Sequence, residues 1–199
     1  MRKRLFAKFW GWFEPRTRHR FARYRAQLVA GLDGRVLEIG CGNGANFEHY
    51  TASATVTATD YSEHMLEPAR QAAEGASATI EVQSADAMAL PFENASFDAA
   101  VSSLVLCSVP DQGRALAELR RVLRPGGELR IFEHVRSERA WVAALQGVIT
   151  PLWRIPGDGC HLNRETNRAV RDAGFEVESS EQLALGLPHV QLRARSPQP

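Results

Sequence analysis

The chain has 199 residues, a composition ordinary for a folded protein and a formal net charge of +1. That length fits one domain that can bury a sizeable core without disulfide bonds. Its three cysteines are too few and too scattered for a disulfide framework, and no apolar run is long enough to span a membrane. These features exclude a disulfide-stapled secreted scaffold and favour a reducing, cytoplasmic location.

The N-terminal segment, residues 1–30, differs from the remainder in charge and in pattern. Nine basic residues and a single acidic one fall within residues 1–25, so the remaining residues carry a net negative charge. Such asymmetry indicates an anionic partner. Five large apolar residues recur on one face of a predicted helix: Leu5, Phe6, Phe9, Trp10 and Phe13.

Two interpretations of this segment stay open. A helical cap would pack the aromatic face on the domain, whereas a monotopic helix would lay the same face on a membrane surface, as a peripheral contact through residues 1–25. A nucleic-acid partner is disfavoured, because phosphate binding does not need five large apolar residues on one face. Residues 31–199 are predicted to form the main domain.

From residue 35 onward, strand-like and helix-like stretches alternate. Strands are predicted over 35–39, 54–60, 78–86, 96–106, 128–135, about 175–183 and 189–195. Helices are predicted over 46–52, 63–75, 112–123, about 140–153 and 164–174. Ser62, Asp111 and Asn163 are the expected N-caps of three of them. This alternation predicts an α/β fold with a parallel, doubly wound sheet.

The most informative stretch is VLEIGCGNGANF at residues 36–47, where a strand runs into three glycines before a helix begins. Glycines allow a tight turn and let backbone N–H groups approach a ligand at the positive end of a helix. Glu38 precedes the first glycine by two residues, and Asp60 ends the next strand, where it could bind both hydroxyls of a ribose. The spacing differs from the G-x-G-x-x-G of nicotinamide-dependent enzymes, which disfavours that class.

Over about residues 30–135 the sequence resembles the class I S-adenosylmethionine-dependent methyltransferases. SADAMALPF (84–92) is similar to the adenine-binding stretch of that family, with Asp86 placed to accept from the adenine amino group. FDAAVSS (97–103) is similar to the strand under the methionine part, and VLRPGGELRIFEHV (122–135) to the helix, turn and strand that follow.

The resemblance implies a Rossmann-like, seven-stranded, mostly parallel sheet with helices on both faces, together with the N-terminal helical cap. It also implies S-adenosyl-L-methionine as cofactor, S-adenosyl-L-homocysteine as product, and no metal. The residues that it assigns to cofactor binding are Glu38, Gly40, Cys41, Gly42, Asn43, Asp60, Tyr61, Asp86, Ala87, Ser103 and Leu104.

The C-terminal half is similar to the methyltransferase-like-seven group, the alkyl thiol S-methyltransferases. In that group an E-H-V after the fifth strand, a D-G-C tripeptide, an R-E-T/S-W helix start and a late P-H-I/V recur together. This chain carries FEHV (132–135), GDGCHLNRET (157–166) and LPHV (187–190) in that order. The resemblance implies methylation of a small, fairly apolar thiol.

Two departures from the group's pattern affect the expected acceptor. Asn167 stands where the group has tryptophan, and Asn163 where threonine is common, so the acceptor is expected to be more polar or differently placed. Animal members carry a longer hydrophobic N-terminal anchor. This chain begins directly with the basic aromatic segment, so surface attachment at most is expected.

The candidate catalytic residue is His134, which could act as a base at the carboxyl end of the fifth strand, where ligands collect in such sheets. The alternative is a histidine hydrogen-bonded inside the substrate wall. Glu133 should point to the opposite face. Cys107 is expected to be a buried, inert thiol that could line the acceptor site. The loop at 157–166 should lie over the acceptor side, with Asp158 and Cys160 structural and no second pair to complete a metal site.

Three functions therefore stay open. The leading hypothesis is methyl transfer to a small-molecule thiol. A second is N- or O-methylation of a phospholipid or natural product, which would suit the basic N-terminus. A third is a non-catalytic, cofactor-binding, membrane-associated protein, against which the complete set of glycines and acids argues. Nucleic-acid methylation is disfavoured, because no N/D-P-P-Y/F motif follows the fourth strand.

Overall fold

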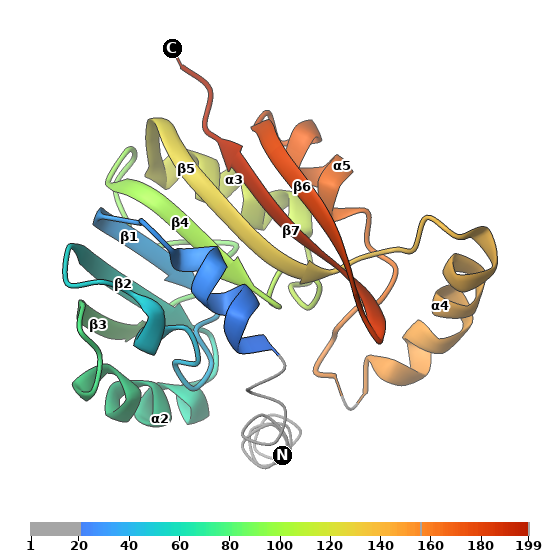
Figure 1. Ribbon diagram of the computed structural model, residues 1–199, viewed down its shortest axis with the longest axis horizontal. Helices are drawn as coiled ribbons and strands as arrows, with labels where there is room; N and C mark the ends of the chain where they lie inside the picture. Colours follow the sequence, from blue (N-terminus) through green and yellow to red (C-terminus); the bar gives the residue numbers. More distant parts are fainter. Residues whose placement is uncertain (1–20, 156, 199) are drawn as a thin grey trace.

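The computed structural model describes residues 21–155 and 157–198, in which seven strands form one sheet of order β3-β2-β1-β4-β5-β7-β6 (Figure 1). The strands are β1 (Gly34–Ile39), β2 (Ala54–Asp60), β3 (Thr79–Ser84), β4 (Phe97–Ser103), β5 (Leu123–His134), β6 (Glu176–Leu185) and β7 (Leu187–Arg195). β1 to β5 pair in parallel, and β7 runs antiparallel to both β5 and β6. The predicted seven-stranded, mostly parallel sheet is confirmed.

Helices cover both faces of this sheet. The helix at 21–29, the short 3₁₀ helix η1 (Phe47–His49) and α2 (Glu63–Glu74) share one hydrophobic cluster. α3 (Gln112–Val122) and α5 (Thr166–Asp172) share the cluster on the opposite face. α4 (Ala140–Trp153) lies to one side, beyond the sheet (Figure 1).

The two clusters follow from the alternation of side chains along the central strands. Val36 packs beneath the helix at 21–29, whereas its neighbour Leu37 packs on the side of α3, and both are fully buried. On the first face the Tyr24 ring stacks on Phe132, with 6.0 Å between ring centroids. Each such side chain contributes roughly 1.5–3 kcal/mol of hydrophobic stabilisation. The central strands are therefore fixed from both sides.

The expected helical cap is described only from residue 21 onward. Residues 21–29 are helical, and Leu28 and Val29 are buried against the sheet. Residues 1–20, which carry the predicted aromatic face and most of the basic charge, lie outside the described residues. Among the described helices, none is both long enough and apolar enough to cross a membrane.

The prediction of a helix over 46–52 is wrong, because only the single 3₁₀ turn η1 forms there. Its flanking residues are held by tertiary contacts, because the side chains of Asn46 and Tyr50 both donate to the carboxylate of Glu38. Tyr50 then takes an extended backbone conformation, with φ −72° and ψ 141°, which ends the turn. A buried contact with β1 has overridden a weak local preference.

The predicted N-caps have different outcomes. Asp111 caps α3, because its carboxylate accepts from the N–H of Arg114 at 3.0 Å. Ser62 occupies the N-cap of α2 without a side-chain capping bond. The prediction of Asn163 as the cap of α5 is wrong, since this helix begins at Thr166 with Glu165 at the N-cap position. Arg164, placed in the helix by the sequence pattern, instead contacts the loop after β4.

Candidate active site

The glycine turn after β1 combines tight packing with an open side. Gly40 and Gly42 both have φ of 58°, in the left-handed region that favours glycine. A Cβ atom on Gly40 would lie 2.4 Å from the side chain of Val105, in the loop after β4. A Cβ atom on Gly42 would meet nothing within 4 Å. At Gly40 the turn therefore packs closely against the loop after β4, whereas at Gly42 it leaves room for a ligand.

Asp60 is held at the rim of this turn. Its carboxylate accepts from the backbone N–H of Gly42 at 2.9 Å and of Ser62 at 2.7 Å. Tyr61 follows it with 63% of its surface exposed. Asp60 thus connects the end of β2 to the glycine turn through a half-buried carboxylate.

Asp86 takes a corresponding place after β3. One of its carboxylate oxygens accepts from the N–H of Met88 at 2.9 Å, and the residue forms an isolated bridge with Ala89. Asp60 pairs with Ser84 in the sheet, so the two aspartates follow the ends of adjacent strands. An open glycine turn flanked by two fixed carboxylates at successive strand ends is a suitable set of groups for the backbone, ribose and base of an adenosyl cofactor.

Glu38 lies beneath the turn. It is 1% exposed, and its two carboxylate oxygens accept from the Asn46 amide at 2.9 Å and the Tyr50 hydroxyl at 2.8 Å. Burial raises its pKa from 4.5 to about 7, against the lowering effect of these donors and of Arg25. Cys41 is also buried, and burial raises the pKa of its thiol well above the ordinary value. Both residues hold the turn in shape, and Cys41 is no reactive thiolate.

The loop at 104–109, which follows β4, begins with a strained residue. Leu104 has φ of 60°, which costs a non-glycine residue on the order of 1–2 kcal/mol. Its N–H donates to the carbonyl of Phe132 at 2.7 Å, and Ser103 before it ends β4 half-buried. Asn43 and Ala87, the remaining predicted cofactor residues, lie in the glycine turn and directly after Asp86. The structure therefore brings the predicted cofactor residues to one edge of the sheet.

A residue outside the predicted set holds the loop at 104–109 in place. The fully buried carboxylate of Glu133 accepts four hydrogen bonds of 2.8 to 3.2 Å. The donors are the Ser102 hydroxyl and the backbone N–H groups of Val105, Leu106 and Cys107. Burial raises its pKa, although these donors act in the opposite direction. The one signal in the sequence for this supporting role was the position of an acidic residue, Glu133, within the otherwise apolar end of β5.

The carbonyl side of the same loop is held by the 157–166 stretch. The guanidinium of Arg164 donates to the carbonyl oxygens of Leu106 and Val109, and the N–H of His161 donates to that of Cys107 at 2.8 Å. Burial lowers the pKa of Arg164, with nearby acidic groups acting against that shift. The loop thus has fixed partners for both its N–H and its C=O groups. The 157–166 stretch therefore packs against the loop at 104–109, and its place over the acceptor side stays a prediction.

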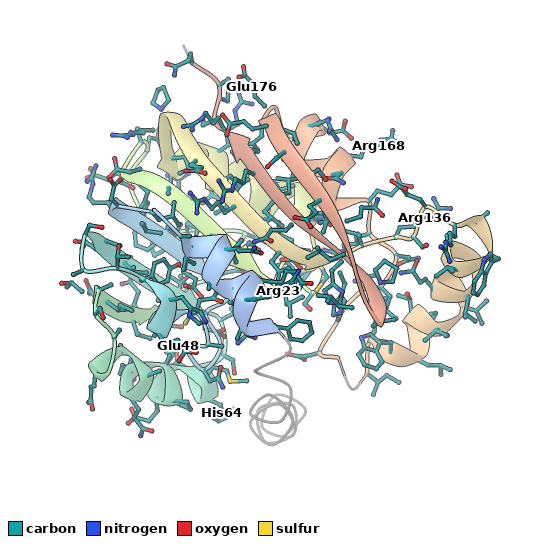
Figure 2. All side chains as sticks on the ribbon, viewed as in Figure 1. Arg23, Glu48, His64, Arg136, Arg168 and Glu176 are labelled. Atoms are coloured by element: carbon teal, nitrogen blue, oxygen red, sulfur yellow. The ribbon has the colours of Figure 1, made fainter. Side chains whose placement is uncertain are left out.

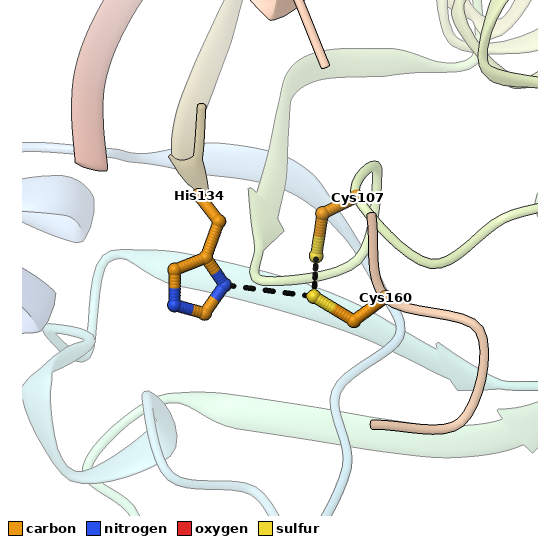
Figure 3. A group of neighbouring side chains, drawn as sticks. All are labelled: Cys107, His134 and Cys160. Atoms are coloured by element: carbon orange, nitrogen blue, oxygen red, sulfur yellow. Dashed lines mark hydrogen bonds between the residues drawn. The ribbon is translucent and has the colours of Figure 1, made fainter. Parts of the chain in front are cut away.

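Cys107, His134 and Cys160 meet at this position, and we call them the Cys–His cluster (Figure 3). The two sulfur atoms are 3.5 Å apart, and the Cys160 sulfur lies 3.7 Å from Nδ1 of His134. The sequence did not predict that the D-G-C cysteine, Cys160, has a second cysteine beside it. Cys107, 53 residues away in sequence, is its partner. Neighbouring His161 instead contacts the backbone of Cys107.

The two thiols of the cluster differ in acidity. The hydrogen bond between them lowers the pKa of Cys160 and raises that of Cys107, and the neighbouring His134 further lowers that of Cys160. These shifts favour ionisation of Cys160 over that of Cys107. That Cys160 is structural rather than reactive stays a prediction.

The late sequence motifs converge on the cluster. His189 of LPHV pairs with His134 across β5 and β7, and the two rings lie 4.2 Å apart between centroids. FEHV therefore supplies both Glu133 and His134, GDGCHLNRET supplies Cys160 and Arg164, and LPHV supplies His189. Their co-occurrence in sequence corresponds to one contiguous region at the carboxyl end of β5.

A groove of about 460 Å³ opens next to this region, lined by Val135, Arg164 and residues of α5. Its rim is polar: Arg136, labelled in Figure 2, pairs with Glu165 at 2.8 Å. Asn167, which stands where the resembled group has tryptophan, lines the groove and accepts from the Ser180 hydroxyl at 3.0 Å. The substitution therefore makes the wall of a groove more polar, as the sequence suggested.

Comparisons with known proteins agree with this geometry. The family described as "Methyltransferase domain" matches residues 37–131. Human thiol S-methyltransferase TMT1B is 36% identical over 194 residues, which cover 91% of this chain and 78% of that protein. This chain belongs to the class I S-adenosylmethionine-dependent methyltransferases. Its cofactor is S-adenosylmethionine, the methyl donor of that family.

Two further relatives place this methyltransferase among related enzymes. Phosphatidylethanolamine N-methyltransferase of Cereibacter sphaeroides is 31% identical over 166 residues, covering 82% of this chain and 81% of that protein. A solved S-adenosylmethionine-dependent methyltransferase of Thermotoga maritima has a TM-score of 0.72 and 24% identity. The match covers 98% of this chain and all of that one. The last comparison concerns the fold alone.

The pKa of Glu38 predicts a pH dependence of stability. A carboxyl whose pKa is raised in the folded state favours folding while protonated, so its contribution falls as the pH rises from about 4.5 to about 7. That loss is roughly 3 kcal/mol for a shift of this size. Glu38→Gln removes the titration, and the Asn46 amide can flip its unpartnered Oδ1 toward the new amide. Between about pH 4.5 and about pH 7, we expect the free energy of unfolding of Glu38→Gln to rise relative to that of the wild type by this amount.

Urea unfolding of both proteins at pH 5, 6, 7 and 8, steps chosen around that interval, measures the difference. Glu178→Gln is the matched control, because its exposed carboxylate pairs with Arg195 at the surface and contributes little. Parallel stability curves for wild type and Glu38→Gln would contradict the raised pKa.

Replacement of Glu133 tests the support of the loop at 104–109. In Glu133→Gln one amide N–H₂ group must face backbone N–H donors, so we expect a loss of about 2–4 kcal/mol in the free energy of unfolding. Glu178→Gln serves again as the surface control and should change stability by less than about 1 kcal/mol. Equal stability of the two variants in urea unfolding would show that Glu133 does not support the loop.

Proposed function

We propose that this methyltransferase transfers the methyl group of S-adenosylmethionine to the sulfur of a small, fairly apolar thiol. Supporting this is the region where FEHV, GDGCHLNRET and LPHV meet, directly beside the glycine turn. Val105 touches Gly40, and Cys107 lies two residues further along the same loop. The similarity to human thiol S-methyltransferase TMT1B covers 91% of this chain, which points to the same acceptor class.

The cofactor contacts are proposed residue by residue. The open face at Gly42, with Cys41 and Asn43, would face the methionine part, which Ser103 and Leu104 would approach from the end of β4. Asp60 would bind the ribose hydroxyls with Tyr61 alongside, and Asp86 with Ala87 would bind the adenine amino group. Gly40 and Glu38 would shape the turn from beneath rather than touch the cofactor, since both are engaged by the protein itself.

The chemistry needs little beyond placement. S-adenosylmethionine supplies a sulfonium methyl that is already activated, and a thiolate placed in line with it is a strong nucleophile. A free thiol with pKa near 8.5 is only a few per cent ionised at neutral pH, so the protein must take up or displace its proton. His134 is the candidate base for that proton, because it ends β5 beside the loop at 104–109.

N-methylation of a phospholipid is the second candidate. The similarity to phosphatidylethanolamine N-methyltransferase of Cereibacter sphaeroides favours it, as does an exposed apolar surface on α4. Trp141, Leu145, Val148, Ile149 and Leu152 recur on one face of that helix and are 39–74% exposed. The inward side of α4 instead carries Gln146 and Thr150, both buried and hydrogen-bonded.

An acceptor panel separates these functions. Purified protein is incubated with labelled S-adenosylmethionine and, in parallel, a small thiol, an amine, a phenol and phosphatidylethanolamine vesicles. We expect label in the thiol product. Label in the phospholipid alone would replace the leading proposal with the second candidate, and no transfer to any acceptor would contradict both.

Asp60→Ala tests the cofactor assignment. Loss of a charge-assisted acceptor costs about 1.5–3 kcal/mol, so S-adenosylmethionine should bind at least about tenfold more weakly. Titration calorimetry measures this affinity. Asp33→Ala, which removes an exposed aspartate before β1, is the matched control and should bind the cofactor as the wild type does. Unchanged affinity in Asp60→Ala would refute the ribose contact.

We infer that the protein also attaches peripherally to anionic membranes. The exposed apolar face of α4 and the basic residues of 1–25 support this, because such surfaces combine apolar insertion with attraction to acidic lipids.

In liposome flotation we expect binding to vesicles with phosphatidylserine, and less binding to neutral ones. Trp141→Ser with Leu152→Ser should reduce it at least about tenfold, whereas Glu74→Ser on exposed α2 should not. Flotation that is unaffected by the α4 changes would exclude this surface.

A further inference from the structure

The Cys–His cluster assembles three metal-ligating side chains from three separate segments. Cys107 comes from the loop after β4, His134 from the end of β5, and Cys160 from the turn after α4 (Figure 3). One ligand atom of each lies within 4.8 Å of the others. Within residues 21–155 and 157–198 no other group of three such residues is this compact. Two soft thiols and one imidazole are a donor set that zinc prefers.

The distances can be compared with those that an ion would impose. Tetrahedral zinc, with Zn–S of about 2.3 Å and Zn–N of about 2.0–2.1 Å, separates two sulfur ligands by about 3.8 Å and a sulfur from a nitrogen by about 3.6 Å. The sulfur atoms of Cys107 and Cys160 are 3.5 Å apart, and Cys160 Sγ lies 3.7 Å from His134 Nδ1. These two pairs match a shared ion to within a few tenths of an ångström. The third pair, Cys107 and His134, lies within 4.8 Å, so a shared ion would draw these two side chains together by up to about 1.2 Å.

The backbone around the cluster is fixed from outside it. Glu133 holds the N–H of Cys107 at 3.2 Å, and the N–H of His161 holds its carbonyl at 2.8 Å. On the other side Asp158 and Gly159 have φ of 44° and 93°, and this tight turn aims Cys160 inward. A Cβ atom on Gly159 would lie 3.1 Å from the Ser108 carbonyl, so the two segments are in close contact. Supports of this kind hold metal ligands in register.

The cluster also lies where an ion would affect methyl transfer. It occupies the carboxyl end of β4 and β5, and its loop touches the glycine turn through Val105 and Gly40. Three protein ligands leave one position of a tetrahedral ion for a substrate group. A zinc ion bound to a thiol favours the thiolate, because the ligand must lose its proton to coordinate.

We propose that Cys107, His134 and Cys160 bind a zinc ion whose fourth coordination position takes the sulfur of the acceptor thiol. The second half of this proposal rests on the proposed thiol methyltransferase function, whereas the first half does not. The acceptor R–SH would release its proton to solvent on coordination. Its sulfur would then form a bond to the methyl carbon, while the carbon–sulfonium bond breaks and its electron pair stays on S-adenosylhomocysteine. The thioether product is a weaker ligand and would leave the ion. In this scheme the zinc ion, and not His134 acting as a base, would activate the acceptor thiol.

The metal site is tested on the full chain, independently of turnover. Wild type, Cys107→Ser, Cys160→Ser and His134→Asn are purified with a phosphine reductant, which excludes a disulfide between the two cysteines. Zinc is quantified by mass spectrometry after dialysis, and cobalt(II) is titrated as a coloured probe. Cys41→Ser is the matched control, because it removes a buried cysteine outside the cluster. Circular dichroism establishes that each variant is folded.

We expect about one zinc per chain in wild type and Cys41→Ser, with thiolate-to-cobalt charge-transfer absorption on titration. Each cluster variant should bind zinc at least about tenfold more weakly in competition with a chelator. His134→Asn keeps both sulfurs, so it should retain weakened charge-transfer bands even if a cysteine variant fails to fold. Reduced, folded wild type that binds neither metal, or cluster variants that bind like Cys41→Ser, would overturn the site.

The fourth position is tested by adding ethanethiol to the cobalt-loaded protein. An additional thiolate ligand should strengthen the charge-transfer absorption, whereas ethyl methyl sulfide, the methylated product, should leave it unchanged. Zinc binding without this response would overturn the role of the ion in acceptor binding. Thiol methylation by metal-free protein would do the same, while leaving the proposed function intact. Zinc binding without any thiol methylation would instead contradict the proposed function and leave the metal site standing.

Discussion

The buried carboxylate of Glu133 accepts hydrogen bonds from three consecutive backbone N–H groups, at Val105, Leu106 and Cys107. These donors are removed from water, so each would cost about 1–3 kcal/mol if left unpaired. The carboxylate therefore fixes the course of the chain after β4, including the strained residue Leu104 from which it departs. Two regions depend on that course. Val105 packs against the glycine turn, and Cys107 belongs to the Cys–His cluster.

The acidic residues of this edge divide into two kinds. Glu38 and Glu133 are fully buried, each of their carboxylate oxygens accepts from a protein donor, and burial raises the pKa of each. Asp60 and Asp86 lie at the rim, where each accepts backbone N–H groups and keeps partial access to solvent. The first pair shapes the turn and the loop, whereas the second pair is placed to meet a ligand. Position relative to the sheet, not residue type, separates the two roles.

The region proposed to receive the acceptor is built from segments that are distant in sequence. β5, the turn before α5 and β7 contribute His134, Cys160 and His189, while Arg164 ties the same turn to the carbonyls of the loop at 104–109. Each contact constrains its partner, so a change in one motif disturbs the others. This coupling gives a physical reason for the joint occurrence of the three motifs in the resembled group. Asn167 varies from that group at the wall of a groove, outside these contacts.

Sequence alone determined the alternation of strands and helices, the glycine turn and the acids at its rim, because apolar periodicity and turn-forming residues act locally. The family resemblance then supplied the sheet topology. Tertiary structure decided the rest. Only η1 forms where a helix was expected over 46–52, because Glu38 accepts hydrogen bonds from Asn46 and Tyr50. Cys160 lies beside Cys107, which is 53 residues away in the sequence. Such pairings arise from burial and side-chain packing in the folded chain, which spacing along the sequence does not encode.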